Sequence, residues 1–336
     1  MELENKKLPI PFIGKISIAL FVFLFVFIFS LILGAAHISI KDVWLAIFSH
    51  TNSESITILR ELRIPREVGA ISVGAALAVS GAIMQGITKN PLADPGLLGL
   101  TAGGNFALAI ALAFIPSLNY FGIMITCFIG AALGTLLVFG ISFIKGNSLS
   151  PLKLVLAGAA ISTFLTAAAE GIGLFFKVSK NISMWTSGGL IGTNWSQLQL
   201  IVPFIFVGLL VSIVLSKQLS ILSLSEEIAI GLGQQIKYIK VILFIVITIL
   251  AGASVALVGN MAFIGLMIPH IVRIIVGTDY RQIIPMSAIF GATFMVIADT
   301  LGRTLYAPLE TSVAAIVTML GLPFFLFIVN KGGKGF

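Results

Sequence analysis

The sequence has 336 residues, of which 58% are hydrophobic and only 10% are charged, and its mean hydropathy is +1.12. A soluble domain has about 25% charged residues, so this composition excludes a soluble enzyme, a nucleic-acid-binding protein and a disordered chain. The fold class that it predicts is an all-α protein that crosses the membrane several times. We expect the formal net charge of +7 to reside mainly in cytoplasmic loops.

Ten segments are apolar enough to be transmembrane helices, each of which needs about 20 such residues. The eighth is the weakest prediction because it is short and contains Pro269. Alternating the loops from a cytoplasmic N-terminus puts most lysines and arginines inside, which predicts that both termini are cytoplasmic. The predicted spans are residues 16–36, 66–87, 95–115, 119–144, 152–176, 196–216, 238–259, 261–276, 283–303 and 312–330.

The chain contains a candidate internal repeat. A shift of 178 residues aligns Gly74–Gly81 with Gly252–Gly259 and also pairs Pro91 with Pro269. Chance similarity among abundant small residues is the alternative explanation. If the repeat is real, its copies start in the second and seventh spans and cross in opposite directions, as in many transporters. We therefore expect one transmembrane domain over residues 1–336, with possible repeats at about 60–180 and 238–330.

Few ionisable residues lie inside the predicted spans, where a charge is costly and is usually kept for function. We find Glu170 and Asp299 there, and Asp94 at the edge of a span. Asp299 precedes Arg303 by four residues, a spacing that favours a structural ion pair, whereas Glu170 has no evident partner. The chain also lacks a phosphate-binding loop and the common hydrolase motifs. We expect no catalytic residue, metal or cofactor.

The segment from Asn90 to Gly99 interrupts a hydrophobic stretch with two prolines and an aspartate. Asp94 followed by Pro95 is typical of a helix N-cap and first helical position. Two interpretations are open, a plain cytoplasmic turn or a broken helix, which membranes tolerate only against protein or a water-filled cavity. We expect the second, with Asn90, Pro91, Asp94 and Pro95 lining a translocation path.

Residues 223–233 predict a short cytoplasmic helix between the sixth and seventh spans. Ser223 and Glu226 have the spacing of a capping box, and Gly231 or Gly233 can end the helix. The spacing alone is equally compatible with a passive loop helix and with a helix that docks on a partner protein.

Two long blocks of the sequence carry a family resemblance. The first block comprises Arg63-Ile64-Pro65-Arg66, Gly74-Ala75-Ala76-Leu77-Ala78, Gly81 and the segment from Asn90 to Gly99. The second comprises Phe263-Ile264-Gly265-Leu266, Pro269-His270-Ile271, Arg273, Asp279, Arg281, Pro285, Ala298-Asp299 and Arg303. Both blocks resemble the FecCD-type permeases of ABC importers for ferric siderophores, haem and cobalamin, and the resemblance covers nearly the whole chain.

This resemblance implies a permease in a bacterial cytoplasmic membrane, with a second permease subunit, identical or different, two separate ATPase subunits and an extracytoplasmic binding protein. It implies an iron chelate such as a ferric siderophore as cargo, without choosing among siderophores, haem and cobalamin. Arg63 and Arg303 match arginines that bind acidic residues of the binding protein. Ser225 stands where the family commonly has glycine, which leaves the helix start open. The implied ATPase-coupling residues are Glu226, Glu227, Ala229, Gly231, Leu232 and Gly233.

The alternative function is an ion-coupled secondary transporter built on the inverted repeat, with Glu170 as the coupling group. An intramembrane enzyme is a third possibility, but the sequence contains no catalytic motif that supports it.

Overall fold

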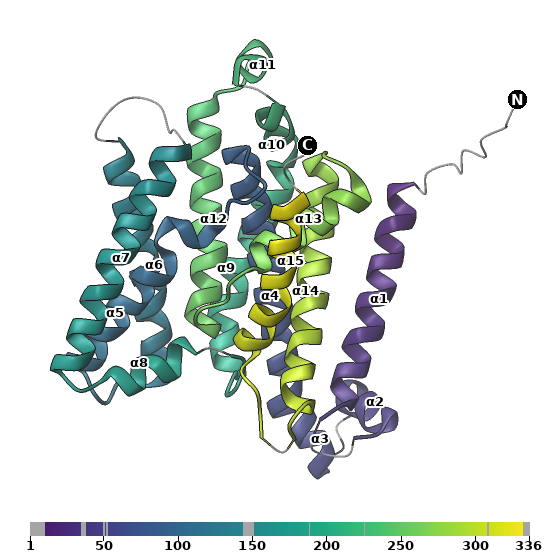
Figure 1. Ribbon diagram of the computed structural model, residues 1–336. Helices are drawn as coiled ribbons and strands as arrows, with labels where there is room; N and C mark the ends of the chain where they lie inside the picture. The colour runs from purple at the N-terminus through teal and green to yellow at the C-terminus, as the bar shows by residue number, and fades with distance from the viewer. Residues whose placement is uncertain are drawn as a thin grey trace, which may run out of the picture.

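The computed structural model describes residues 11–34, 38–49, 51, 53–143, 151–187, 189–224, 226–307 and 309–331. Within these ranges the chain consists of helices and connecting loops and contains no β-strand. Figure 1 shows that the long helices run side by side in a bundle. The predicted all-α fold class is therefore confirmed.

Among the described residues, seven helices are long and apolar enough to cross a membrane, and three shorter apolar helices accompany them. The ten predicted spans fall on these helices, although a crossing by all ten stays a prediction. The long helices are α1 (Phe12–Ile32), α4 (Ile64–Thr88), α6 (Tyr120–Phe143), α7 (Pro151–Phe175), α9 (Trp195–Val214), α12 (Ile236–Val258) and α14 (Tyr280–Thr304), and the shorter ones are α5 (Leu100–Phe114), α13 (Ile264–Val276) and α15 (Val313–Lys331).

The remaining elements lie at the two ends of the bundle or between its helices. They are α2 (Ile40–Phe48), α3 (Glu54–Ile58), the π-helix η1 (Leu59–Arg63), the 3-10 helix η2 (Pro95–Leu98), α8 (Ser179–Thr186), α10 (Ser216–Leu224) and α11 (Glu226–Gly231). In Figure 1, α10 and α11 lie at the same end as the start of α1 and the end of α15, which we call the α11 end. Helices α2, α3 and α8 lie at the other end, the α8 end.

Helix α4 is the centre of one packed group, which also contains α9, α12, α13 and α14. In the segment Glu54–Thr88, 94% of the most apolar stretch is buried. Backbones touch here, because a Cβ on Gly74 would lie 2.2 Å from the carbonyl oxygen of Gly291, and one on Gly81 would lie 1.9 Å from that of Gly265. Such small-residue contacts are how membrane helices associate closely.

The predicted repeat is not reflected in this packing. Gly252, which the repeat aligns with Gly74, has only ordinary contacts, the nearest being a side-chain atom of Ala131 at 3.7 Å. The repeat therefore stays a prediction.

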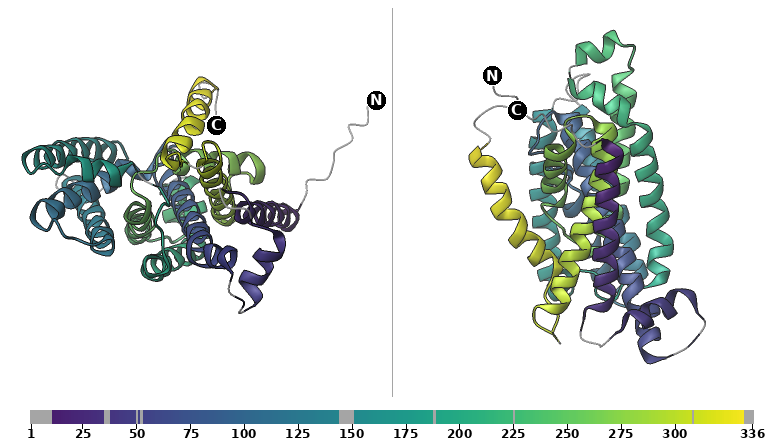
Figure 2. Two further views of the ribbon diagram at one scale, coloured as in Figure 1. Left: turned by 90° about the horizontal axis from the view of Figure 1, so that it is seen from below. Right: turned by 90° about the vertical axis from the view of Figure 1, so that its right-hand side faces the viewer.

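Helices α5, α6 and α7 form a second group with α8, at the left of Figure 1 and of the left view in Figure 2. A Cβ on Gly103 of α5 would lie 2.3 Å from the carbonyl oxygen of Gly130 on α6. Helix α12 contacts both α4 and α6 and so joins the two groups. Helix α7 lies at the edge of the molecule, where only 22% of its most apolar stretch is buried.

Candidate functional site

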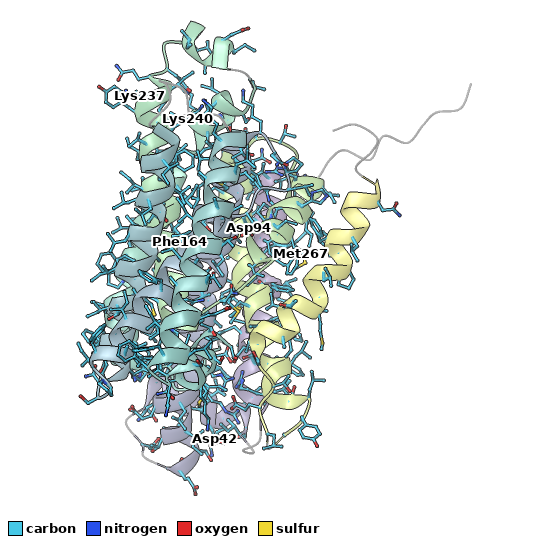
Figure 3. All side chains as sticks on the ribbon, turned by 60° about the vertical axis from the view of Figure 1, so that its left-hand side comes forward. Asp42, Asp94, Phe164, Lys237, Lys240 and Met267 are labelled. Carbon is cyan, nitrogen blue, oxygen red and sulfur yellow. The ribbon has the colours of Figure 1, made fainter. Side chains whose placement is uncertain are left out.

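The break that follows α4 lies inside the bundle. The sequence placed Asp94 at the edge of a span, but Figure 3 shows it at about the depth of Phe164 on α7 and Met267 on α13. In the same view it lies between Lys240 near the α11 end and Asp42 at the α8 end. The interruption is therefore not a turn at the end of the bundle, because the chain has already re-entered the bundle when it reaches Asp94.

The predicted N-cap at Asp94 is confirmed, but the helix that it starts is short. Its Oδ1 accepts a hydrogen bond from the backbone N–H of Gly96 at 2.7 Å, and Pro95 is the first helical residue. The helix is the four-residue η2, and Gly99, with a φ of +73°, separates it from α5. The single span predicted at 95–115 is thus a 3-10 turn followed by a shorter α-helix.

Two cavities open beside this break and along α7. The first, of about 420 Å³, has Asp94 and Pro95 in its lining, and the second, of about 370 Å³, contains Glu170. Asn105 on α5 and Thr166 on α7 line both. Of the four path residues predicted from the sequence, two line the first cavity. Pro91 lines a different cavity at the α11 end, and Asn90 lines none of these three.

The sequence analysis identified Glu170 on α7 but missed the hydroxyl residues Ser162 and Thr166 on the same helix. Hydroxyl groups are common in membrane helices and carry little information one at a time. Ser162, Thr166 and Glu170 stand four residues apart, which places them on one face of the helix, and this spacing was the available signal. All three line at least one of the two cavities.

The predicted capping box of the short helix is wrong. Ser223 lies inside α10, where its hydroxyl donates a hydrogen bond to the carbonyl of Ser220 at 2.8 Å, and α11 begins only at Glu226, so Ser223 does not hold the N-cap position of α11. The pattern misleads because α10 continues to Leu224, only two residues before α11 begins. Residue 225, which directly precedes α11, lies outside the described residues, as does the side chain of Glu226.

The predicted end of the short helix is confirmed. Gly233 has a φ of +78°, and its N–H donates to the carbonyl of Ile230 at 2.8 Å. The N–H of Gln234 donates to the carbonyl of Ala229 at 2.9 Å. These two bonds form a Schellman motif, which requires a residue such as glycine in the left-handed region.

Most described side chains of α11 and the turn after it point away from the rest of the chain. Ile230 is 64% exposed and Leu232 62%, and Glu227 and Gly231 are exposed as well. Ala229 is fully buried. Of the predicted coupling residues that the structure describes, Ala229 therefore faces the chain, while its neighbours present an apolar surface at the α11 end.

Helix α10 ties α11 to the start of α14. The Ser220 hydroxyl donates to Asp279 Oδ1 at 2.8 Å and accepts from the N–H of Tyr280 at 2.8 Å. Asp279 also accepts from Nε of Arg281 at 2.9 Å. The hydrogen bond from the Arg281 side chain lowers the pKa of the Asp279 carboxyl to about 2. The loop before α14 is therefore held to α10 by an ionised carboxylate.

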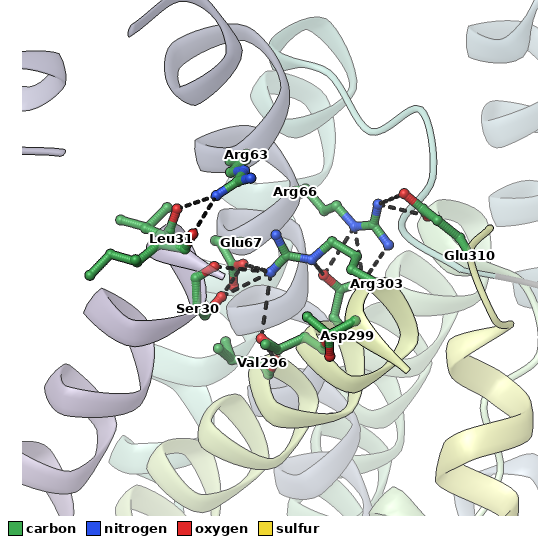
Figure 4. Close-up of polar contacts among 12 residues, drawn as sticks. Ser30, Leu31, Arg63, Arg66, Glu67, Val296, Asp299, Arg303 and Glu310 are labelled. Carbon is green, nitrogen blue, oxygen red and sulfur yellow. Dashed lines mark hydrogen bonds and ion pairs between the residues drawn. The ribbon is translucent and has the colours of Figure 1, made fainter. Parts of the chain in front are cut away.

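Three arginines at the α8 end, Arg63, Arg66 and Arg303, are buried, and Figure 4 shows them among their polar partners. Arg303 is 7% exposed; its Nε lies 3.1 Å from Asp299 Oδ2, and it also pairs with Glu67. The predicted ion pair between Asp299 and Arg303 is confirmed. Arg63, also 7% exposed, donates to the carbonyl of Leu31 at 2.6 Å.

The same cluster contains residues that the sequence analysis did not single out. Arg66 contacts Asp299 Oδ1 at 2.9 Å and Glu310 Oε2 at 2.9 Å. Glu67 lies inside the predicted span 66–87 and was overlooked as an intramembrane carboxylate. Its position next to Arg66 could have drawn attention to Glu67, but its ion-pair partner Arg303 is 236 residues away in the chain. Binding of a partner protein by Arg63 and Arg303 stays untested, and it would require both to leave their partners inside the chain.

Comparison with known proteins gives the family. Residues 22–331 match the FecCD transport family. The chain is 44% identical over 307 residues to the iron(3+)-hydroxamate import system permease protein FhuB of Bacillus subtilis (strain 168), covering 91% of this chain and 80% of that protein. It is 37% identical over 312 residues to the hemin transport system permease protein HmuU of Yersinia pestis, covering 89% and 90%.

The fold agrees with this match. The structure resembles that of a metal-chelate type ABC transporter in an inward-facing conformation, with a TM-score of 0.84, 26% sequence identity and coverage of 94% of this chain and 99% of that one. The alternatives of a secondary transporter and an intramembrane enzyme are therefore set aside. The chain belongs to the FecCD transport family and is a permease subunit of the ABC importer type.

Proposed function

We propose that this chain is the permease subunit through which a ferric siderophore of the hydroxamate type crosses a bacterial cytoplasmic membrane. The observation that carries this proposal is the 44% identity, over 91% of the chain, to a permease named for iron(3+)-hydroxamate import. The relative named for Fe(3+)-citrate import is 38% identical. ATP hydrolysis is supplied by separate ATPase subunits, and the loaded chelate by an extracytoplasmic binding protein.

The second permease subunit is a different chain in this proposal. Two relatives from Bacillus subtilis, FhuB and FhuG, are both named permease proteins of an iron(3+)-hydroxamate import system, and they are 44% and 32% identical to this chain. A pair of unlike permeases would form one path between them.

In the proposed orientation the α11 end is cytoplasmic and ten helices cross the membrane. The distribution of lysine and arginine supports this orientation, because cytoplasmic loops are enriched in both. The proposed ATPase contact is α11 and its turn. Ile230 and Leu232 are exposed, and α11 lies beyond the ends of the long helices in Figure 1. An exposed apolar patch rimmed by polar residues is typical of a protein contact.

The test is uptake of a radiolabelled ferric hydroxamate by proteoliposomes that contain the permease pair, the ATPase and the binding protein. Uptake should require ATP and persist with a protonophore. Uptake without ATP that collapses with the protonophore would contradict the proposal.

A second measurement tests the ATPase contact. The variants Gly231→Leu and Leu232→Glu should lose ATPase binding and uptake while the permease inserts normally, because both positions are exposed and the Gly231 change meets nothing in the chain. The matched control is Leu62→Ser, which changes a leucine that is also 62% exposed but lies at the α8 end. Normal coupling in both α11 variants would place the contact elsewhere.

A further inference from the structure

The middle of the exposed face of α7 is unlike the exposed faces of other long helices, although Leu156 at 62% and Leu174 at 74% exposure flank it. On α9, large apolar side chains face outwards, among them Phe206 at 59% and Val207 at 54% exposure, as expected against lipid tails. Along residues 159–171 of α7, Phe164 is the one large apolar side chain that is exposed. The other exposed residues there are Ala159, Ala160, Thr163, Thr166, Ala167, Glu170 and Gly171.

This face carries a carboxylate as well as small side chains. An ionised residue on a membrane helix usually faces protein or a water-filled cavity, because exposure to lipid is costly. Glu170 lies on the outward side of α7 and lines the cavity of about 370 Å³. The face is therefore better suited to an aqueous path than to lipid.

The polar side chains form a continuous line rather than isolated points. Ser162, Thr166 and Glu170 follow one another at intervals of four residues on α7, and Asn105 of α5 and Thr166 both line the two cavities. Asp94 also lines the first cavity. We call these five residues the polar track.

Glu170 lies at the α8 end of this track. Figure 3 places Asp94 and Phe164 at about the same depth. Glu170 follows Phe164 by six residues, which corresponds to about 9 Å along a helix, in the direction of α8.

Glu170 differs from the carboxylates of the arginine cluster at this end of the molecule because it has no partner in the described part of the chain. Glu67, Asp299 and Glu310 each pair with an arginine. No hydrogen bond or ion pair joins the Glu170 carboxylate to any residue in the described ranges. Its negative charge is therefore available to a molecule that moves along the track.

We propose that Glu170 makes the polar track a charge filter that favours ferric chelates bearing a cationic group over anionic chelates of the same shape. The choice of chelates rests on the proposed function, but the filter itself does not. A fixed charge in a cleft with low-dielectric walls concentrates ions of opposite sign, and rings of acidic residues select cations in channels by the same physics. The hydroxyl and amide groups of the track can hydrogen-bond chelate oxygens without adding charge.

The first test compares uptake of three ferric trihydroxamates made from one parent compound, with a free ammonium, an acetylated amine or a succinylated amine. In the Glu170→Gln variant the ratio of cationic to anionic uptake should fall by roughly fivefold, the factor that corresponds to one partly exposed ion pair. Because every sample uses the same binding protein, the change in ratio isolates the permease.

The matched control is Glu61→Gln, which removes an exposed carboxylate near the α8 end but outside the track. Its uptake ratio should equal that of the wild type. If the wild type transports the chelates and Glu170→Gln leaves the ratio unchanged, the filter is overturned while the proposed function stands. If the wild type transports none of them, the proposed function fails, and the second test decides the filter alone.

The second test needs no cargo. In the Thr166→Cys variant, a cationic water-soluble thiol reagent should react faster than an anionic one, and adding Glu170→Gln should remove most of that preference. The native Cys127 is 1% exposed and should not interfere. Failure of Thr166→Cys to react, or a preference that survives Glu170→Gln, would overturn the filter.

Discussion

Helices α4 and α7 both have 25 residues and both are rich in glycine and alanine, yet they use these residues in opposite ways. In α4, a Cβ on Gly81 would collide with the backbone of α13 at 1.9 Å. In α7, a Cβ on Gly171 would meet nothing within 4 Å. Their charges differ in the same way, because Arg66 and Glu67 of α4 are paired and Glu170 of α7 is not paired within the described ranges.

The comparison shows that a small residue in a membrane helix acquires its role from what lies opposite. Where another backbone lies opposite, as along α4, close contact provides the dispersion attraction that replaces the hydrophobic effect in lipid. Where no described residue lies opposite, as at Gly171 of α7, the same residue leaves room for a partner subunit or a cargo. The α4 group should therefore carry the stability of the fold, and α7 should carry little of it.

The largest expected effect comes from breaking the charge cluster that holds α4 to α14. Asp299 is fully buried and contacts both Arg66 and Arg303. Asp299→Ala leaves a buried positive charge uncompensated and should lower the free energy of unfolding by about 3–5 kcal/mol. Thermal unfolding in detergent measures this loss, with the exposed Glu61→Ala as control, for which a change within about 0.5 kcal/mol is expected.

Thermal unfolding also tests Arg303, one of the two arginines that the family resemblance implies contact the binding protein. Arg303→Met leaves the buried Glu67 without its ion-pair partner, so the melting temperature should drop. If the melting temperature is unchanged and only binding-protein affinity falls, the arginine acts at the surface and the burial seen here does not describe the docked state.

The next largest effect tests the backbone contacts of α4. Gly81→Ala forces α4 and α13 apart, and overpacking of this kind should destabilise the protein by about 3 kcal/mol. The matched change on α7 is Gly171→Ala, which meets no neighbour and should stabilise the helix by about 0.5–1 kcal/mol. Equal effects of the two substitutions on thermal unfolding would contradict the comparison between α4 and α7.

The smallest effect concerns Asp279, which links the start of α14 to α10 at the α11 end. Because the folded-state pKa of Asp279 is lowered to about 2, its stabilising contribution is present above the unfolded value of about 4. That contribution is lost as the pH falls through about 2. Asp279→Ala also removes the N-cap of α14 and should cost about 1 kcal/mol at neutral pH.

The pH dependence provides the measurement for Asp279. The difference in unfolding free energy between wild type and Asp279→Ala should shrink as the pH is lowered from about 4 towards 2. A difference that is constant with pH would show that the carboxylate contributes nothing through its charge.

The sequence predicted features that depend on neighbouring residues. Hydropathy located the ten helical segments, Asp94 before Pro95 located a helix start, and Gly233 located the end of α11. The capping prediction at Ser223 failed because the same local pattern occurs inside α10. Local patterns do not show which of two adjacent helices a residue belongs to.

Features that depend on distant residues were not predictable in this way. The partner of Glu67 is on α14, and the polar track exists only because α5 and α7 lie side by side. Even the depth of Asp94 depends on how the chain re-enters the bundle after α4. No spacing in a single segment carries such information, and the family resemblance named neither Glu67 nor Glu170.

The close contacts of α4 also have a consequence for how the protein is made. Arg66 and its partner Asp299 are separated by 233 residues, and ribosomes add about 5–20 residues per second. Helix α4 must therefore wait roughly 10–50 s in the membrane before α14 is synthesised. During this interval Arg66 and Glu67 are expected to stay near the water at the end of α4. Nascent chains that stop before Ile264, the first residue of α13, lack both α13 and α14 and should be substrates for membrane quality-control proteases.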